Sequence, residues 1–185
     1  MKKVIPSFLT ILNLICGCFA IALAFQFQFE AVLILVCLGN LFDFLDGFAA
    51  RALNSVTNFG KHLDSITDVI TSGVVPGIVV FQLFKLSGNK VSDFEVLIFG
   101  YDLIFSLSPI SFIAFLITIG SAIRLSKFNT SIGSDEFIGL PTPANAIFFS
   151  ALPVLINSEL FLESKEIFLN NYFLITSILF SVFLM

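Results

Sequence analysis

The sequence has 185 residues, of which 57% are hydrophobic and 12% are charged, and its formal net charge is −4 at pH 7. The mean hydropathy of +1.04 and the scarcity of charge exclude an ordinary soluble domain and indicate an integral membrane protein. The small, dispersed net charge argues against nucleic acid as a partner, and the three cysteines lie in apolar segments without the spacing of zinc ligands.

Apolar segments predict an all-α polytopic membrane protein of about six transmembrane helices, forming a single domain over residues 1–185. The first apolar segment is long enough to cross the bilayer, so we expect a retained helix rather than a cleaved signal peptide. The last segment is shorter than the roughly 20 residues that a span needs, so either the natural chain continues or this helix is tilted. The segments cover residues 7–25, 31–52, 61–84, 108–126, 141–157 and 171–185.

Residues 94–107 are apolar but too short and interrupted for a span, so we expect an interfacial or re-entrant piece on the outer side. With six spans, the excess of Lys and Arg falls on the side of the N-terminus and of the turn at 52–60. That side is therefore predicted to be cytoplasmic, in a multi-pass protein of the cytoplasmic (inner) membrane. It carries Lys2, Lys3, Arg51, Lys61, Arg124 and Lys127, and the other side carries Lys85, Lys90 and Lys165.

Four carboxylates interrupt the second and third apolar segments. Asp43 and Asp46 are three residues apart, and Asp64 and Asp68 are four apart, so each pair lies on one face of its helix. If the two helices are antiparallel and joined near Ser55, the two pairs meet at one depth, roughly 13 to 18 Å from the turn at about 1.5 Å per residue.

Such a cluster would repel itself strongly in a low-dielectric environment unless cations held it. Ligands that are all oxygen suit hard cations such as Mg²⁺, Mn²⁺ or Ca²⁺, and the sequence therefore predicts one or two divalent ions. The alternative is that some acids are ordinary helix-end residues in water, and Asp64 would be stabilised near a helix N-terminus in any case. That alternative does not explain two pairs at one depth.

Small residues alternate with these acids. Gly47, Ala50 and Gly60 allow either a neighbouring helix or a ligand to approach the backbone closely. Their interleaving with the carboxylates favours a ligand.

The residues Asp46-Gly47, Ala50-Arg51, Gly60, Asp64 and Asp68 form the pattern D-G-x-x-A-R, eight residues, G-x-x-x-D-x-x-x-D. This pattern resembles the signature of the CDP-alcohol phosphatidyltransferase family, and Asp43 is an additional leading acid. Within that family the chain is most similar to the integral-membrane phosphatidylserine synthases of bacteria. Further stretches that carry this likeness are I-P-S-F-L-T-I-L-N-L near the start, G-V-V-P at 73–76, R-L-S-K-F-N at 124–129 and G-L-P-T-P-A-N-A at 139–146.

The resemblance implies six core helices, a homodimer and a polar cavity at the cytoplasmic face. It implies transfer of a phosphatidyl group from CDP-diacylglycerol to L-serine, giving phosphatidylserine and CMP, with one or two Mg²⁺ or Mn²⁺ ions. Asp43, Asp46, Asp64 and Asp68 would be the metal ligands, with the Gly47 carbonyl assisting.

The remaining roles follow from the same chemistry. Asp68 would also act as general base on the serine hydroxyl. Arg51 would hold a nucleotide phosphate, and Ala50 and Gly60, like Gly47, would leave room for the CDP moiety. Arg124 and Lys127 either anchor the fourth span at the cytoplasmic face or hold the lipid phosphate or the serine carboxylate.

Three alternatives are considered at this stage, and the intact set of four aspartates argues against one of them, a non-catalytic family member that serves as a scaffold. The same reaction could use glycerol 3-phosphate or an inositol phosphate as acceptor, although such acceptors would call for more basic residues in the cavity. An ion or proton transporter could also contain buried acids, but the sequence shows no second copy of the acidic motif.

Overall fold

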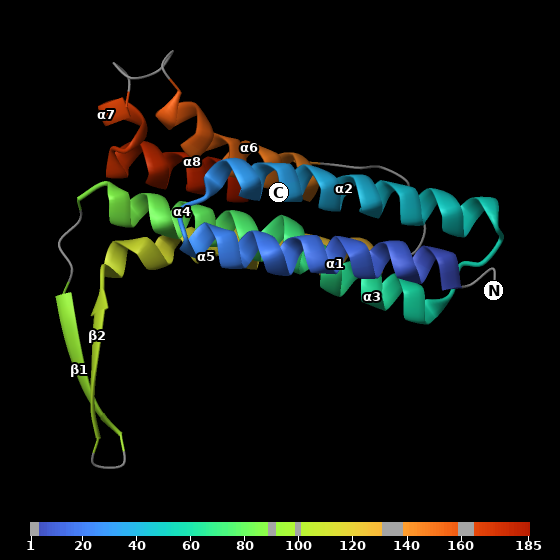
Figure 1. Cartoon of the computed structure of the whole chain (residues 1–185), viewed down its shortest axis with the longest axis horizontal. Coiled ribbons are helices and arrows are strands. Elements are labelled where there is room, and N and C mark those ends of the chain that lie inside the picture. Colours follow the sequence, from blue (N-terminus) through green and yellow to red (C-terminus); the bar gives the residue numbers. More distant parts are fainter. Residues whose placement is uncertain (1–3, 89–91, 99–100, 131–138, 159–164) are drawn as a thin grey trace.

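The protein is described here from a computed structural model, which defines residues 4–88, 92–98, 101–130, 139–158 and 165–185. Its helices lie side by side with their long axes roughly aligned, and a two-stranded hairpin extends from one end (Figure 1). The elements are α1 (Val4–Phe25), α2 (Phe29–Ala52), α3 (Asn58–Asp68), the π-helix η1 (Val69–Val74), α4 (Val75–Leu86), β1 (Ser92–Ile98), β2 (Tyr101–Leu107), the 3₁₀ helix η2 (Pro109–Ala114), α5 (Phe115–Thr130), α6 (Thr142–Asn157), α7 (Lys165–Phe168) and α8 (Asn171–Leu184).

The predicted spans agree with the observed helices to within a few residues at each end. Four described helical stretches are long and apolar enough to cross a membrane, and two shorter apolar helices, α6 and α8, lie beside them. Large apolar side chains such as Phe19, Phe44, Ile119 and Phe180 are exposed on the outer faces of the helices. Exposed side chains of this kind are unfavourable in water and suit a lipid environment, so the chain is a polytopic membrane protein.

A short turn joins α2 to α3. Asn54 takes a positive φ of 47°, which asparagine tolerates better than most residues, and reverses the chain. Thr57 then caps α3, because its side-chain oxygen accepts a hydrogen bond from the backbone N–H of Gly60 at 3.0 Å. The turn therefore holds the end of α2 and the start of α3 at the same end of the molecule as the start of α1 (Figure 1).

The third long helix is not uniform. α3, η1 and α4 run on without a break from Asn58 to Leu86, but residues 69–74 between them form a π-helix. Inside η1 the backbone N–H of Val75 donates to the carbonyl of Ile70, five residues back. Pro76 follows and has no N–H to donate to the preceding turn, and an interior proline also crowds the carbonyl four residues before it. The wider π turn accommodates that proline.

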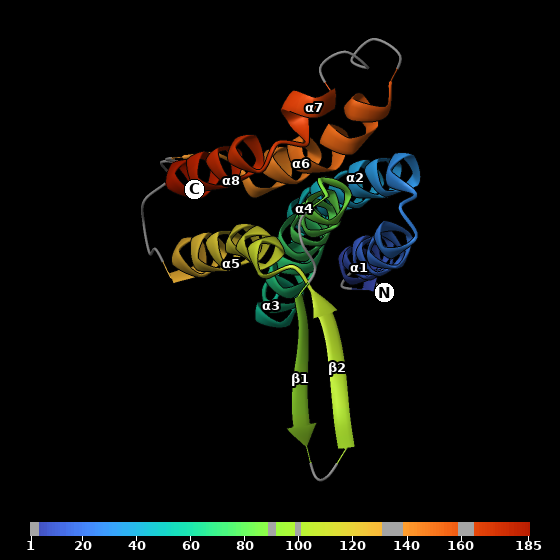
Figure 2. The same ribbon diagram turned by 90° about the vertical axis from the view of Figure 1, so that its left-hand side faces the viewer.

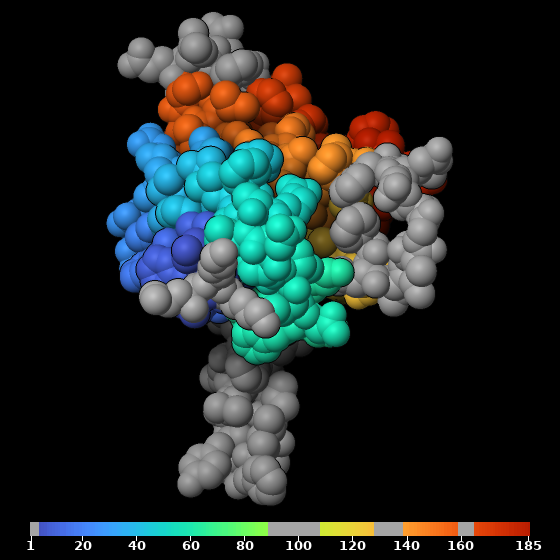
Figure 3. Space-filling model, turned by 90° about the vertical axis from the view of Figure 1, so that its right-hand side faces the viewer, coloured from blue at the N-terminus to red at the C-terminus, as the bar shows by residue number. Residues whose placement is uncertain are grey.

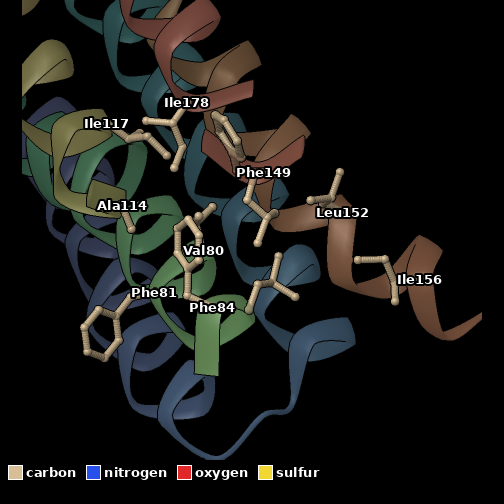
Figure 4. Packing of buried hydrophobic residues seen from close by; sticks show 11 residues of the cluster. Val80, Phe81, Phe84, Ala114, Ile117, Phe149, Leu152, Ile156 and Ile178 are labelled. Atoms are coloured by element: carbon tan, nitrogen blue, oxygen red, sulfur yellow. The ribbon is translucent and has the colours of Figure 1, made fainter. Parts of the chain in front are cut away.

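Two apolar clusters hold the helices together. One joins α1, α2 and α4 through residues such as Ala20, Val36 and Val79. The other joins α4 to α5, α6 and α8, where Phe84 and Phe149 are completely buried (Figure 4). The helix that carries the third and fourth acids is therefore central to the fold.

Residues 92–107 form a hairpin in which β1 and β2 pair antiparallel, with Ser92 opposite Leu107 and Ile98 opposite Tyr101. It projects away from the helices, across their axes, at the end opposite the turn between α2 and α3 (Figures 1 and 2). Of the two alternatives expected here, the re-entrant piece was wrong, because the hairpin does not return among the helices, and the interfacial piece stays a prediction. Aromatic and β-branched residues such as Phe94, Val96 and Tyr101 suit paired strands.

Candidate functional site

Three of the four predicted acids meet. Carboxylate oxygens of Asp43 on α2 and of Asp64 and Asp68 on α3 all lie within 4.8 Å of one another, and all three side chains are partly buried. The four-residue spacing of Asp64 and Asp68 places both on the face of α3 that looks toward α2. The cluster therefore joins the two helices on either side of the turn.

Asp46 is turned toward another helix. Its side chain is 5% exposed, and its Oδ2 accepts a hydrogen bond of 2.5 Å from the hydroxyl of Thr10 on α1. The prediction that the two pairs of acids meet at one depth is thus incomplete, because it treated α2 and α3 as an isolated pair. The spacing of residues within α2 and α3 carries no signal for this bond to Thr10 on α1.

The cluster fits a divalent cation. All its ligand atoms are oxygens, as hard divalent ions require. Oδ1 of Asp64 is buried and has no hydrogen-bond partner among the described residues, so it is available as a ligand. Three partly buried carboxylates within 4.8 Å of one another would repel without positive charge between them.

A cleft of about 330 Å³ opens beside the cluster. It lies between the start of α1, the end of α2 and the start of α3, at the end of the molecule that Figure 3 shows. Asp46 and Asp64 form part of its wall, so the cleft leads directly to the acids. Its lining consists of Pro6, Ser7, Thr10, Asp46, Gly47, Ala50, Arg51, Ser55, Val56, Thr57, Gly60, Lys61 and Asp64.

The small residues predicted from the sequence all line this cleft. A Cβ on Gly47 would meet nothing nearer than Nη2 of Arg51 at 3.9 Å, so no neighbouring helix requires a glycine there. A Cβ on Gly60 would lie 3.1 Å from Oγ1 of Thr57, which is the cap of its own helix. Space beside Gly47 is therefore free for a ligand, whereas helix packing does not explain the residue.

Positive and negative side chains line different parts of the cleft. Arg51 and Lys61 are exposed and line its outer part, while Asp46 and Asp64 line the deeper part. An anion in this cleft would lie between the basic residues at one end and a cation held by the acids at the other. A diphosphate carries enough negative charge to interact with both.

Arg124 and Lys127 do not line this cleft. Both lie on α5, where Arg124 is partly buried and Lys127 is exposed. α5 runs antiparallel to η1, since Thr118 contacts Gly77 and Ser121 contacts Gly73. One further turn along α5 brings Arg124 to about the level of Val69, next to Asp68, so it belongs to the same depth as the acids but approaches from another side.

A tight contact one turn below the acids was not predicted. The hydroxyl of Thr71 on η1 donates to Oδ1 of Asn13 on α1 at 3.0 Å. Glycines let the three helices approach there, since a Cβ on Gly39 of α2 would lie 2.7 Å from Oδ1 of Asn13, and one on Gly17 would lie 2.8 Å from Oγ1 of Thr71. This contact fixes the relative depth of Thr10, Asp43 and Asp68, each three or four residues away along its helix.

Comparisons with known proteins agree with these features. The family model for CDP-alcohol phosphatidyltransferase matches residues 3–183. The chain is 34% identical to the CDP-diacylglycerol–serine O-phosphatidyltransferase of Methanocaldococcus jannaschii, over 84% of this chain and 63% of that protein. It is 32% identical to the enzyme of the same name from Bacillus subtilis, over 75% of this chain and 69% of that protein.

A third relative is named archaetidylserine synthase and comes from Methanothermobacter thermautotrophicus. The identity is 32%, over 80% of this chain and 56% of the relative. The chain thus spans between 56% and 69% of the length of these three relatives.

Proposed function

The chain belongs to the CDP-alcohol phosphatidyltransferase family, and on that basis we propose that it transfers a phosphatidyl group from CDP-diacylglycerol to L-serine, giving phosphatidylserine and CMP. Members of this family use a divalent metal ion. One observation carries the proposal: the residues of the signature converge at one place, with carboxylate oxygens of three aspartates within 4.8 Å of one another and the small residues and Arg51 around an adjoining cleft. The names of the relatives favour serine as acceptor.

Asp43, Asp64 and Asp68 would hold the cation, and Asp46 would complete the site, with Thr10 fixing its orientation. Two Mg²⁺ or Mn²⁺ ions suit four carboxylates better than one, because each ion neutralises two of them. When bound, the metal supplies charge neutralisation on the diphosphate and on the departing CMP. We propose that the Gly47 carbonyl assists the carboxylates as a metal ligand, because the space next to that residue is free.

The cleft is the proposed site of the CDP moiety. Gly47, Ala50 and Gly60 leave room for the nucleotide, and Arg51 would pair with one of its phosphates. Lys61, which the sequence analysis did not assign to the site, lines the same part of the cleft and would add a second cation. The diacylglycerol part would extend toward the exposed apolar faces of the helices.

Asp68 is the proposed general base. It lies one turn beyond Asp64 along α3, away from the mouth of the cleft, and would accept the proton of the serine hydroxyl. The serine oxygen then bonds to the phosphorus that carries the diacylglycerol. The bond from that phosphorus to the bridging oxygen breaks, and CMP leaves with this oxygen and the electron pair.

Arg124 is the proposed partner of the serine carboxylate or of the lipid phosphate, since it approaches the level of Asp68 from α5. Lys127 would bind the same anionic group or the anionic surface of the membrane. We further propose that the protein is a homodimer in the cytoplasmic (inner) membrane, with the cleft open to the cytoplasm. The distribution of Lys and Arg supports this orientation.

Release of CMP by the purified protein in detergent tests the proposal. CDP-diacylglycerol is supplied with Mn²⁺ or Mg²⁺ and with L-serine, glycerol 3-phosphate, an inositol phosphate or no acceptor. We expect release that requires serine and stops with a chelator. Asp43→Asn should be inactive, whereas Glu30→Gln, which changes an exposed acid at the far end of the same helix, should retain activity.

Release of CMP with a phosphorylated acceptor and not with serine would contradict serine as the acceptor but support the phosphatidyl transfer reaction. Absence of CMP release with every acceptor, from a folded protein, would contradict the reaction itself and favour a transporter.

A further inference from the structure

The π-helix η1 begins at the residue after Asp68, and its carbonyl groups are engaged from outside the helix. The hydroxyl of Thr118 on α5 donates to the carbonyl of Gly73 at 3.0 Å. One turn further along α5, the hydroxyl of Ser121 donates to the carbonyl of Ser72 in a longer contact of 3.5 Å. Backbone carbonyls inside a regular helix have partners in their own helix, so hydroxyl donors from α5 mark a place where the ladder is rearranged.

Pro76 accounts for this rearrangement. In an α-helix its N–H would donate to the carbonyl of Ser72, but proline has none, and its ring crowds that carbonyl. Two glycines expose the backbone at this point: a Cβ on Gly77 would lie 2.6 Å from Oγ1 of Thr118, and one on Gly73 would lie 3.2 Å from Cβ of Ser121. Helix α5 therefore lies directly against the backbone that proline leaves short of donors.

The π turn also determines where α3 points. An α-helix turns by about 100° per residue, so each additional residue within the π turn rotates α3 by about that angle relative to α4. α4 is fixed by the core, because Val79, Val80 and Phe84 are completely buried. Without the π turn, α3 would be rotated about its axis, and the face that carries Asp64 and Asp68 would point away from Asp43.

We propose that Thr118 is a positioning residue for the acid cluster: its hydroxyl, with Ser121 and Pro76, holds the π turn that orients Asp64 and Asp68 toward Asp43. The metal role of the cluster rests on the proposed function above. Thr118 is not one of the clustered acids, and it would act on them through the Gly73 carbonyl and η1. Outer partners that orient metal ligands typically change metal affinity or activity by about 10- to 100-fold when they are removed.

Binding of Mn²⁺ alone to the purified protein in detergent, followed by electron paramagnetic resonance, tests this role without any substrate. Thr118→Val keeps the shape of the side chain and removes the donor, and we expect its Mn²⁺ affinity to fall by about tenfold or more. Thr118→Ser keeps the donor and should bind within about twofold of the wild type. Thr176→Val is the matched control, since the hydroxyl of exposed Thr176 donates to carbonyls of Tyr172 and Phe173 in its own helix α8.

Pro76→Ala is an independent test of the same π turn. Alanine restores the missing N–H and removes the crowding, so η1 should convert toward an α-helix and rotate α3. We expect far-UV circular dichroism and melting temperature to be maintained, while Mn²⁺ affinity falls by about tenfold or more. A purely structural role for this region would predict the opposite pattern, with a lower melting temperature and unchanged affinity.

Wild-type Mn²⁺ affinity in folded Thr118→Val or in folded Pro76→Ala would overturn the proposal, as would equal losses in Thr118→Ser and Thr118→Val. Failure of the wild-type protein itself to bind Mn²⁺ would instead contradict the metal role of the cluster. The two failures are therefore distinguishable. CMP release is the second assay. Thr118→Val should lower kcat by about tenfold and leave the KM for CDP-diacylglycerol within about twofold of the wild-type value.

Discussion

Replacing Gly39 with alanine should destabilise the protein, because Gly39 lies where α1, α2 and η1 are in tight contact. The added Cβ would lie 2.7 Å from Oδ1 of Asn13 and 2.9 Å from Cγ2 of Thr71. Both neighbours belong to one hydrogen-bonded pair and are buried, so neither can move without disturbing the other.

The expected magnitude combines three contributions. Overpacking a tight contact costs about 1–3 kcal/mol. Weakening the bond between Thr71 and Asn13 adds about 1 kcal/mol, and the better helix propensity of alanine returns up to about 1 kcal/mol. Gly39→Ala should therefore lower the free energy of unfolding by about 1–3 kcal/mol.

Unfolding in mixed detergent micelles, followed by far-UV circular dichroism, measures this difference. Gly47→Ala is the matched control on the same helix, since a Cβ there meets only Nη2 of Arg51, at 3.9 Å. Its free energy of unfolding should stay within about 0.5 kcal/mol of the wild type or rise slightly. Equal stability of the Gly39 and Gly47 variants would refute the reasoning that the three-helix contact fixes the depth of the acids.

Three further substitutions test the site through CMP release in detergent. Gly47→Ala should leave the protein folded but raise the KM for CDP-diacylglycerol by about tenfold, because the methyl group occupies ligand space; an unchanged KM would remove this glycine from the site. Asp68→Asn should lower kcat by about 10²–10⁴-fold yet retain binding of CDP-diacylglycerol, and full activity would exclude it as general base. Arg124→Ala should raise the KM for serine by about tenfold while that for CDP-diacylglycerol stays constant; an unchanged serine KM would return Arg124 to membrane anchoring.

The helices and part of the cluster could be predicted from the sequence, because both depend on local spacing. Apolar segment length gave the spans, and the four-residue spacing of Asp64 and Asp68 placed both on one face. The position of Asp43 opposite them follows from a short turn, since the depth of each residue is then set by its distance from Ser55. Those inferences required no information about other helices.

The remaining features depend on contacts between segments far apart in the sequence. Asp46 bonds to Thr10 rather than lying within the cluster, because α1 lies beside α2 at that level. The π turn arises where Pro76 leaves the helix without an N–H donor and where the hydroxyl of Thr118, from a distant part of the chain, donates to the carbonyl of Gly73. Proline in an apolar helix was visible in the sequence, but its partner on α5 was not, since periodicity describes one helix at a time.

The most direct test of the central claim is an anomalous difference map from crystals of the protein grown with Mn²⁺. We predict a peak enclosed by the carboxylates of Asp43, Asp64 and Asp68, with a second one toward Asp46 if two ions bind. A map with bound Mn²⁺ elsewhere and no peak at these three carboxylates would contradict the claim that the acids of the two helices meet to hold a divalent cation.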